Sequence, residues 1–505
     1  MLQAHSPYER FLRRILASRF FTISAFLHLL LIVLFGGKVL FNKYVEPPDF
    51  QEVGDSNSAD AAAVPPQAPE PLPPPPSLSV PPPVTRTTLT TITTLAATSM
   101  PAFSMPLPAP APPVIRPGGN KGGVPVFKPI NPADLPKDIR QRVEDHKETI
   151  DHYRGNASTE QNVQRALDWL QAQQHSDGTW GEEFHSAFTG LALLCYLGHG
   201  DTPQWSHQYG VVVTNAINAL VAQANAHNGW MTGFDGCPGK SVYDHAIATY
   251  ALCEAYTMTK DERLVPIIKR AVDYIVKGQR QDGGWTYGYD TTPDNPTATD
   301  ALQHHKSDTS VTGWQVQALK AAHLTGIAGI DDGVHSALDQ AMRSLDRVFS
   351  PKDGSFGYRT AGDGHVFLTG AGALAKLFWL GRPDRIVHEA LKEIESRDLN
   401  YGAADCNIYA WYYDTQACYQ AQGAPWVWWK DRFQTQLTGK QSSDGSWPPT
   451  GGQDQGAGKT DNFGTDTTHD GPIYRTTLCC LMLEVFYRYL PTSQETSLGG
   501  GVQGL

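Results

Sequence analysis

Two kinds of apolar pattern alternate along residues 146–490. In the first kind, hydrophobic residues recur at i, i+3, i+4 and i+7 with polar residues between them, as in Val163, Ala166, Leu167 and Leu170. This spacing predicts an amphipathic helix that buries one face. Further segments of this kind begin near Val213, Val265, Val334, Ile386 and Lys430.

The second kind of segment is apolar on nearly every side, which predicts a buried helix. Six such segments follow the six amphipathic ones, at Gly190–Leu197, Ala246–Cys253, Val311–Ala322, Leu368–Leu380, Ile408–Ala421 and Thr476–Phe486. Equivalent hairpins of an outer and an inner helix can close on themselves and bury the end faces that an open array would have to cap. The pattern therefore predicts an all-α fold, an α/α toroid of six helical hairpins.

A repeated phrase marks the turns of these hairpins. Gln-x-x-Asp-Gly-x-Trp occurs at Gln174–Trp180, Gln279–Trp285 and Gln441–Trp447, and weaker copies end at Trp230 and Phe356. Repetition at such a period indicates a repeat architecture. We expect the glycine to allow a tight reversal, the Trp to cover the end of the hairpin, and the Gln amide to bond neighbouring backbone.

The first 45 residues predict a cytoplasmic N-terminus and a transmembrane anchor. An apolar run from Phe20 to Phe41 is long enough to span a bilayer, for which about 20 residues suffice. Four arginines precede it, so the positive-inside bias puts the remainder outside. A signal peptide cleaved near Ala61–Ala63 is the alternative, but that site lies far from the run. We expect a single-pass inner-membrane protein with a periplasmic, extracytoplasmic domain.

Residues 46–145 predict a disordered Pro/Thr-rich spacer, and residues 491–505 a flexible tail. Between residues 47 and 136 lie 24 of the 37 prolines. Proline runs favour extended polyproline II, which makes a semi-rigid linker. Recognition of the prolines by a partner protein is the other interpretation.

The net charge and the cysteine spacing restrict the expected binding partners and disulfide bonds. The net charge of −11 argues against nucleic acid as a partner. The seven cysteines show no spacing typical of a disulfide framework. Cys195, Cys253, Cys479 and Cys480 lie in apolar segments and look like core residues.

The repeated phrase resembles the QW repeat of squalene–hopene cyclases and protein prenyltransferase β-subunits, whose superfamily folds as α/α toroids. The stretches Tyr243–Thr259, Asp308–Ala322 and Leu483–Pro491 resemble a narrower group. These are membrane-anchored prenyltransferase/squalene-oxidase repeat proteins of planctomycete-like bacteria. The resemblance implies the toroid fold and, for a related enzyme, a polyprenyl or terpenoid-type lipid substrate.

The catalytic motifs of those families are incomplete here. The cyclase acid motif Asp-x-Asp-Asp-Thr is reduced to Asp308-Thr309, with Ser307 at the position of the proton-donating carboxyl. The prenyltransferase zinc ligands resemble Asp405, Cys406 and His469, although the first two are adjacent here. In the alternative interpretation Asp405 caps a helix and no metal binds. We therefore expect no cofactor, with Zn²⁺ as the alternative.

Polar residues recur where the inner helices begin, and parallel inner helices would gather them on one rim. The catalytic candidates are Asp308, His305, His365 and Asp244, and the candidates for a ligand-binding rim are His185, His245, Asp405, Tyr474 and Arg475. Helix caps explain the Asp residues more easily than the His residues. His304 and His305 together with Asp308 form a further candidate metal group.

The anchor carries Ser24 and His28 on one helix face. An ionisable residue inside a membrane helix indicates function. The pattern is similar to the anchor of TonB-type energy transducers, which implies a proton-driven motor complex as partner. The alternative is a neutral His packed in a helix bundle.

The sequence favours a binding or scaffold module for an apolar ligand, such as a lipid or isoprenoid, or for a protein partner. The alternative is an enzyme that acts on a polyprenyl or terpenoid-type lipid through the rim Asp and His residues. A carbohydrate-active toroid that uses paired Asp groups is a third hypothesis without distinctive support in the sequence. The Cys-Gly-Glu-Gln of thioester toroids is absent.

Overall fold

The structure is a computed structural model that describes residues 131–144, 146–182, 184–232, 241–289, 306–363, 366–381, 383–451 and 470–489. All of them belong to one compact unit, Pro108–Leu505. The predicted anchor with Ser24 and His28, most of the predicted spacer and the tail lie outside the described residues. No helix among the described residues is long and apolar enough to cross a membrane.

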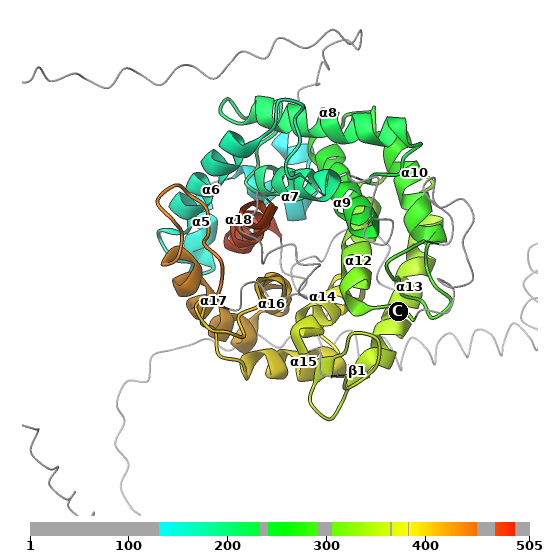
Figure 1. Cartoon of the computed structure of the whole chain (residues 1–505), viewed down its shortest axis with the longest axis vertical. Coiled ribbons are helices and arrows are strands. Elements are labelled where there is room, and N and C mark those ends of the chain that lie inside the picture. The colour runs from blue at the N-terminus through cyan, green and yellow to red at the C-terminus, as the bar shows by residue number, and fades with distance from the viewer. Residues whose placement is uncertain are drawn as a thin grey trace, which may run out of the picture. The chain divides into compact units, whose positions relative to one another are not determined.

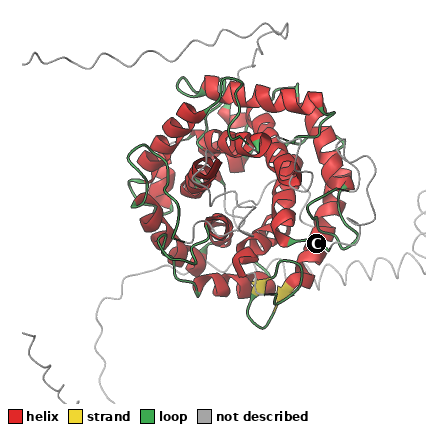
Figure 2. Cartoon of the chain, in the orientation of Figure 1, coloured by secondary structure: helices red, strands yellow, loops and turns green. Residues whose placement is uncertain are grey.

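Two concentric layers of helices form the domain (Figures 1 and 2). The outer layer consists of α6 (Thr159–Gln173), α8 (Gly210–Ala226), α10 (Leu264–Lys277), α13 (Asp331–Val348), α15 (Arg385–Glu395) and α17 (Gly423–Thr438). The inner layer consists of α7 (His185–Gly198), α9 (Ser241–Thr259), α12 (Thr309–Leu324), α14 (Thr369–Leu380), α16 (Ile408–Ala421) and α18 (Asp470–Leu483). Each inner helix follows an outer one, which confirms the predicted α/α toroid of helical hairpins.

The inner helices form a closed ring. Each packs against the next along the chain, and the last, α18, packs against both α7 and α6. The outer layer closes in the same place, where α17 contacts α6. Hydrogen bonds join the starts of inner helices: Asp244 of α9 accepts the Ala187 N–H of α7, and the Tyr409 hydroxyl of α16 donates to the Ser310 carbonyl of α12. The N-terminal ends of these inner helices therefore share one rim of the ring.

Shorter elements complete the domain. A hairpin of β1 (Phe349–Ser350) and β2 (Ser355–Phe356) pairs Phe349 with Phe356 between α13 and α14, and η4 (Val366–Leu368) precedes α14. Before the ring come η2 (Pro132–Asp134), α4 (Lys137–Arg140), η3 (Gln141–Val143) and α5 (His146–His152), and after it comes α19 (Val485–Arg488).

The packed part of the chain begins earlier than the sequence indicated. Leu135, Ile139 and Arg142 are buried although they lie in the predicted spacer, which was to end at residue 145. The helix α19 contacts both η3 and α5. Residues 131–144 and 146–152 therefore form an entry segment that packs on the domain. The prolines among its first residues had indicated a spacer instead.

The Gln of each full turn motif ties two neighbouring hairpins together. Its side-chain amide donates to the carbonyl of the motif glycine and to a carbonyl of the next outer helix. Gln174 donates to Gly178 at 3.1 Å and to Val212 at 3.0 Å. Gln279 donates to Gly283 and to Ala337, both at 2.7 Å. Gln441 donates to Gly445 and to Asn162, both at 2.9 Å. These bonds confirm the predicted role of the Gln.

The motif tryptophans are structural as well. Trp180, Trp285 and Trp447 are buried, and each indole N–H donates to a carbonyl near the end of the preceding outer helix, that of Leu170, Ile275 or Leu437, at 2.7–2.9 Å. The backbone N–H of each Trp donates to a threonine hydroxyl of the following inner helix, on Thr189, Thr312 or Thr476. One residue therefore joins both helices of a hairpin.

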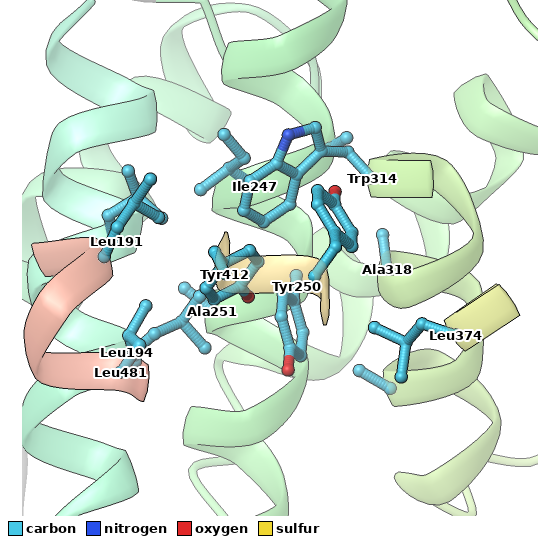
Figure 3. Close-up of a cluster of buried hydrophobic side chains, with 14 of the residues drawn as sticks. Leu191, Leu194, Ile247, Tyr250, Ala251, Trp314, Ala318, Leu374, Tyr412 and Leu481 are labelled. Atoms are coloured by element: carbon cyan, nitrogen blue, oxygen red, sulfur yellow. The ribbon is translucent and has the colours of Figure 1, made fainter. Parts of the chain in front are cut away.

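Side chains of all six inner helices meet in one apolar cluster (Figure 3). Its members include Leu191, Ile247, Trp314, Leu374, Tyr412 and Leu481, and all of these are buried. Trp314 stacks on Tyr412 with ring centroids 5.5 Å apart. The middle of the ring therefore holds a packed core.

Candidate functional site

Asp308 lies at the rim where the inner helices begin, as the N-cap residue of α12. Its Oδ1 accepts hydrogen bonds from the Val311 backbone N–H at 2.8 Å and from the Ser310 hydroxyl at 2.7 Å. Only 1% of the residue is exposed, and no described group makes a hydrogen bond to its Oδ2. The predicted capping role is therefore confirmed, and one carboxyl oxygen remains available.

Burial raises the pKa of Asp308 to about 6. The cause is desolvation, because removal from water destabilises a charged carboxylate more than a neutral carboxyl. The Val311 N–H, the Ser310 hydroxyl, the charge of Arg359 and a hydrogen bond from the Thr286 side chain lower the pKa, but they offset burial only in part. Asp308 can therefore hold or release a proton close to neutral pH.

Tyrosines from several elements surround this carboxyl. The Tyr243 hydroxyl lies 2.9 Å from the Ser310 hydroxyl, and the Tyr409 hydroxyl donates to the Ser310 carbonyl at 3.1 Å. In addition, the Tyr358 hydroxyl donates to that of Tyr287 at 2.9 Å. Burial first, and then the charge of Asp308, raise the pKa of Tyr243 and of Tyr358, so both keep their hydroxyl protons. The rim thus combines a protonatable carboxyl with phenol hydroxyls.

Two other candidates at this rim hold the fold together instead. The carboxylate of Asp244 accepts the Ala187 N–H at 2.7 Å, so it joins α9 to the start of α7. His245 is completely buried: its Nδ1 accepts the Met231 N–H at 3.1 Å and its Nε2 donates to the Ala271 carbonyl at 2.9 Å. The assignment of His245 to a ligand rim was wrong, because both ring nitrogens bond backbone, that of Met231 in the preceding turn and that of Ala271 on the next outer helix, α10.

The remaining rim candidates are only partly placed. His185 begins α7, and its buried Nδ1 has no hydrogen-bond partner in the described part of the chain. Tyr474 is half-buried, and the buried Arg475 donates to the Trp447 carbonyl at 3.3 Å. His304, His305, His365 and His469 lie outside the described residues.

The two adjacent residues of the predicted zinc site, Asp405 and Cys406, differ in their exposure to solvent. Asp405 is exposed, whereas Cys406 is buried. Neither belongs to a group of potential metal ligands among the described residues. The zinc site stays a prediction, because His469 lies outside the described residues. The alternative in which Asp405 caps α16 was wrong: the N-cap is Asn407, whose side chain accepts the Ala410 N–H at 3.0 Å.

Sequence reasoning missed a second polar region, at the opposite end of the inner ring. A pocket there is lined by Arg142, Tyr250, Glu254, Gln317, Lys320 and Tyr489, among others. Arg142 donates to both carboxylate oxygens of Glu254, at 2.8 and 3.3 Å, and both residues are buried. Burial raises the pKa of Glu254, but the charges of Arg142 and Arg488 outweigh this effect and lower it overall.

Nothing in the sequence around Arg142 or Glu254 signalled this region, because their contact joins residues 112 positions apart. The ion pair compensates the two charges, and Arg142 also donates to the Arg488 carbonyl at 2.8 Å. These bonds hold the entry segment and the last helix on the ring. Asp308 also has a buried oxygen without an ordinary hydrogen bond, and tyrosine hydroxyls lie beside it, so we take the N-terminal rim as the candidate ligand site.

The fold and the geometry of this site define the chain as an α/α toroid with a titratable carboxyl, that of Asp308, at one rim. No family model matches it, and neither does any curated protein. Among solved structures, an α-1,6-mannanase of Salegentibacter sp. HEL1_6 matches with 12% identity over 65% of this chain and 98% of that chain, at a TM-score of 0.45. An inactive variant of that enzyme with α-1,6-mannotetrose matches with 12% identity over 66% and 99%, at 0.46. A protein from Actinoplanes matches with 16% identity over 65% and 99%, at 0.42. At these values the similarity carries no argument about function.

Proposed function

We propose that this protein is a ring-shaped binding module whose ligand site is the rim around Asp308. The observation that carries the proposal is the buried Oδ2 of Asp308, which accepts no hydrogen bond of ordinary length and angle from a described residue, although the Thr286 side chain is near enough to the carboxyl to lower its pKa. A buried polar atom without a partner costs roughly 1–3 kcal/mol. Asn at this position would cap the helix equally well. A buried carboxyl that is kept here despite its cost therefore has another role, and the simplest is to accept a hydrogen bond from a ligand.

The neighbouring groups favour a ligand that carries hydroxyl groups. The hydroxyls of Tyr243, Tyr358 and Tyr409 can exchange hydrogen bonds with such a ligand, and their rings offer faces for its carbon skeleton. A neutral oligosaccharide has this chemistry. The wholly apolar ligand suggested by the sequence has less support, because the middle of the ring is filled by its own side chains (Figure 3).

The second candidate is an enzyme in which Asp308 is a general acid. Its raised pKa favours this, because a general acid works best with a pKa near the operating pH. The same pKa weakens the polyprenyl-cyclase alternative, since protonation of an alkene needs a strong acid. Glycoside hydrolysis needs a second carboxyl. Asp363, the acidic residue of the neighbouring loop, already accepts backbone N–H bonds from Tyr358, Arg359 and Thr360.

The predicted anchor and spacer add the location to this proposal. Residues 1–45 would hold the chain in the inner membrane, and residues 46–130 would carry the ring into the periplasm. Ser24 and His28 would then be free to contact a motor complex in the membrane. Cross-linking of the full chain in cells, compared with a His28→Ala variant, tests this part separately.

The ligand is tested by calorimetric titration of the full chain, purified in mild detergent, with a panel of neutral oligosaccharides and with a polyprenol. Asp308→Asn is the informative variant because Asn keeps the N-cap. Asp384→Asn, which alters the N-cap of outer helix α15, is the matched control. We expect saturable oligosaccharide binding that Asp308→Asn weakens at least tenfold and Asp384→Asn leaves unchanged. Binding of the polyprenol alone, or equal binding by both variants, would overturn the proposal. Release of new reducing ends, lost in Asp308→Asn, would favour the enzyme.

A further inference from the structure

Three side chains from separate elements converge beneath the ring. His146 begins α5 in the entry segment, Glu160 lies in the first turn of α6, and His199 follows α7. The Nδ1 of His146 is 3.1 Å and the Nε2 of His199 is 3.0 Å from the same Glu160 oxygen, Oε1. The three ligand atoms all lie within 4.8 Å of one another.

The outer nitrogen of each imidazole fixes its tautomer. The Nε2 of His146 lies 2.7 Å from the Arg142 carbonyl oxygen, which can only accept, so Nε2 must carry the hydrogen. The Nδ1 of His199 lies 2.7 Å from an Asp201 carboxylate oxygen, which requires a hydrogen on Nδ1. In neutral imidazoles the inward nitrogens therefore present lone pairs, and both face another acceptor, the Glu160 carboxylate.

Two lone pairs and a carboxylate oxygen cannot face one another without a cation between them. Either both histidines carry an extra proton, or one metal ion takes the place of the protons. The second possibility fits the surroundings, because metal-binding histidines typically donate their other N–H to a carboxylate or a backbone carbonyl. In addition, the Tyr487 ring stacks on His146 at a centroid distance of 3.9 Å and holds its plane.

We propose that His146, Glu160 and His199 bind one divalent transition-metal ion, with Zn²⁺ as the first choice. Zinc accepts imidazole nitrogen and carboxylate oxygen at about 2.0–2.2 Å, so tetrahedral ligands are separated by about 3.3 Å. The two nitrogen–oxygen distances of 3.1 and 3.0 Å are close to that separation, and the two nitrogens lie within 4.8 Å of each other. The ion would fasten the entry segment, which follows the predicted spacer, to the first hairpin of the ring.

A second group of possible ligands provides an internal control. His323, Asp331 and His335 also lie close together, on α12 and α13. There, however, the Asp331 oxygen at 3.0 Å and the His335 Nε2 at 3.3 Å both approach the same atom, Nδ1 of His323. One nitrogen cannot serve both neighbours and a metal, and the Asp331 carboxylate is half exposed. This group is not a preformed site.

The test is binding of Zn²⁺ to the full chain, freed of metal with a chelator, measured by equilibrium dialysis with elemental analysis. We expect one ion per chain, bound with at least tenfold lower affinity after Glu160→Gln and unaffected by His335→Ala. Glu160→Gln keeps the size of the side chain, and His199→Gln serves as a second variant if it does not fold. Replacement by Co²⁺ gives a visible spectrum that reports nitrogen and oxygen ligands. No saturable binding by the unmodified chain, or equal binding by the Glu160→Gln chain, would overturn the proposal and leave the protonated triad.

Discussion

The side-chain amide of Gln441 donates to the backbone carbonyl of Asn162 at 2.9 Å and so joins the last motif turn to the first outer helix. The two residues are 279 positions apart, yet the contact copies those that Gln174 and Gln279 make with the next helix along the chain. The motif therefore closes the ring by the same bond with which it links successive hairpins.

Replacement of this amide should weaken ring closure. Gln441→Ala removes the bonds to Asn162 and Gly445 and leaves their carbonyls without that donor. We expect a loss of about 1–3 kcal/mol in the free energy of unfolding, measured by urea denaturation. Gln161→Ala, at an exposed position of the neighbouring helix α6, should change it by less than about 0.5 kcal/mol. Equal effects of the two variants would mean that the Gln441 bonds contribute nothing.

The glycine of the same turn should tolerate no side chain. Gly445 has φ of +99°, and a Cβ there would lie 2.2 Å from the Arg165 carbonyl oxygen on α6. Gly445→Ala should therefore cost more than the roughly 1 kcal/mol expected for Ala at a positive φ in open space. Gly381 is the matched control, because its φ is +68° and nothing lies within 4 Å of the added atom. A cost no greater than that of Gly381→Ala would show that the helices at the closure can move apart.

His245 should make the domain sensitive to mild acid. Burial lowers its pKa to about 4, while a histidine in the unfolded chain titrates near 6.5. Since the unfolded chain binds the proton first, stability is retained above about pH 6.5 and falls as the pH drops toward 4, by about 3 kcal/mol in total. The His245→Asn variant, in which the amide oxygen can still accept the Met231 N–H, should lack this part of the pH dependence. An unchanged slope in the variant would assign acid sensitivity to other groups.

Asp308 should make the stability of the domain depend on pH in the opposite direction. Its folded-state pKa of about 6 lies above the ordinary value of 3.8, so the folded protein keeps a proton that the unfolded chain loses. Stability should fall by about 3 kcal/mol as the pH rises from about 4 to 6, and Asp308→Asn should not show this fall. Unfolding free energies of both proteins across this range measure the difference. If the two curves are parallel, the carboxyl imposes no cost on the fold.

The repeated features of the fold could be predicted from the sequence, because each copy depends only on residues close together in the chain. The spacing of Gln174, Gly178 and Trp180 recurs with each hairpin and so predicted both the turns and the toroid. The cap at Asp308 followed from its place before an apolar helix. His245 was misassigned because a helix start in the sequence does not reveal which carbonyls, here that of Ala271, lie opposite the side chain.

Contacts between distant segments were not accessible. The ion pair of Arg142 with Glu254 and the convergence of His146 on His199 depend on how the entry segment packs beneath the ring. The proline content before that segment indicated a spacer, and no local pattern indicates that α19 covers it. Only the closed ring brings these residues together.

The most direct test of the proposed site is the titration of the Asp308 carboxyl. Infrared difference spectra between the unmodified chain and its Asp308→Asn variant isolate the C=O band of the protonated acid as the pH is changed. We predict that this band persists to a midpoint near pH 6, as expected for a carboxyl at a buried rim, where desolvation disfavours its charged form. A midpoint near the ordinary aspartate value of about 4 would contradict a rim site built on this residue.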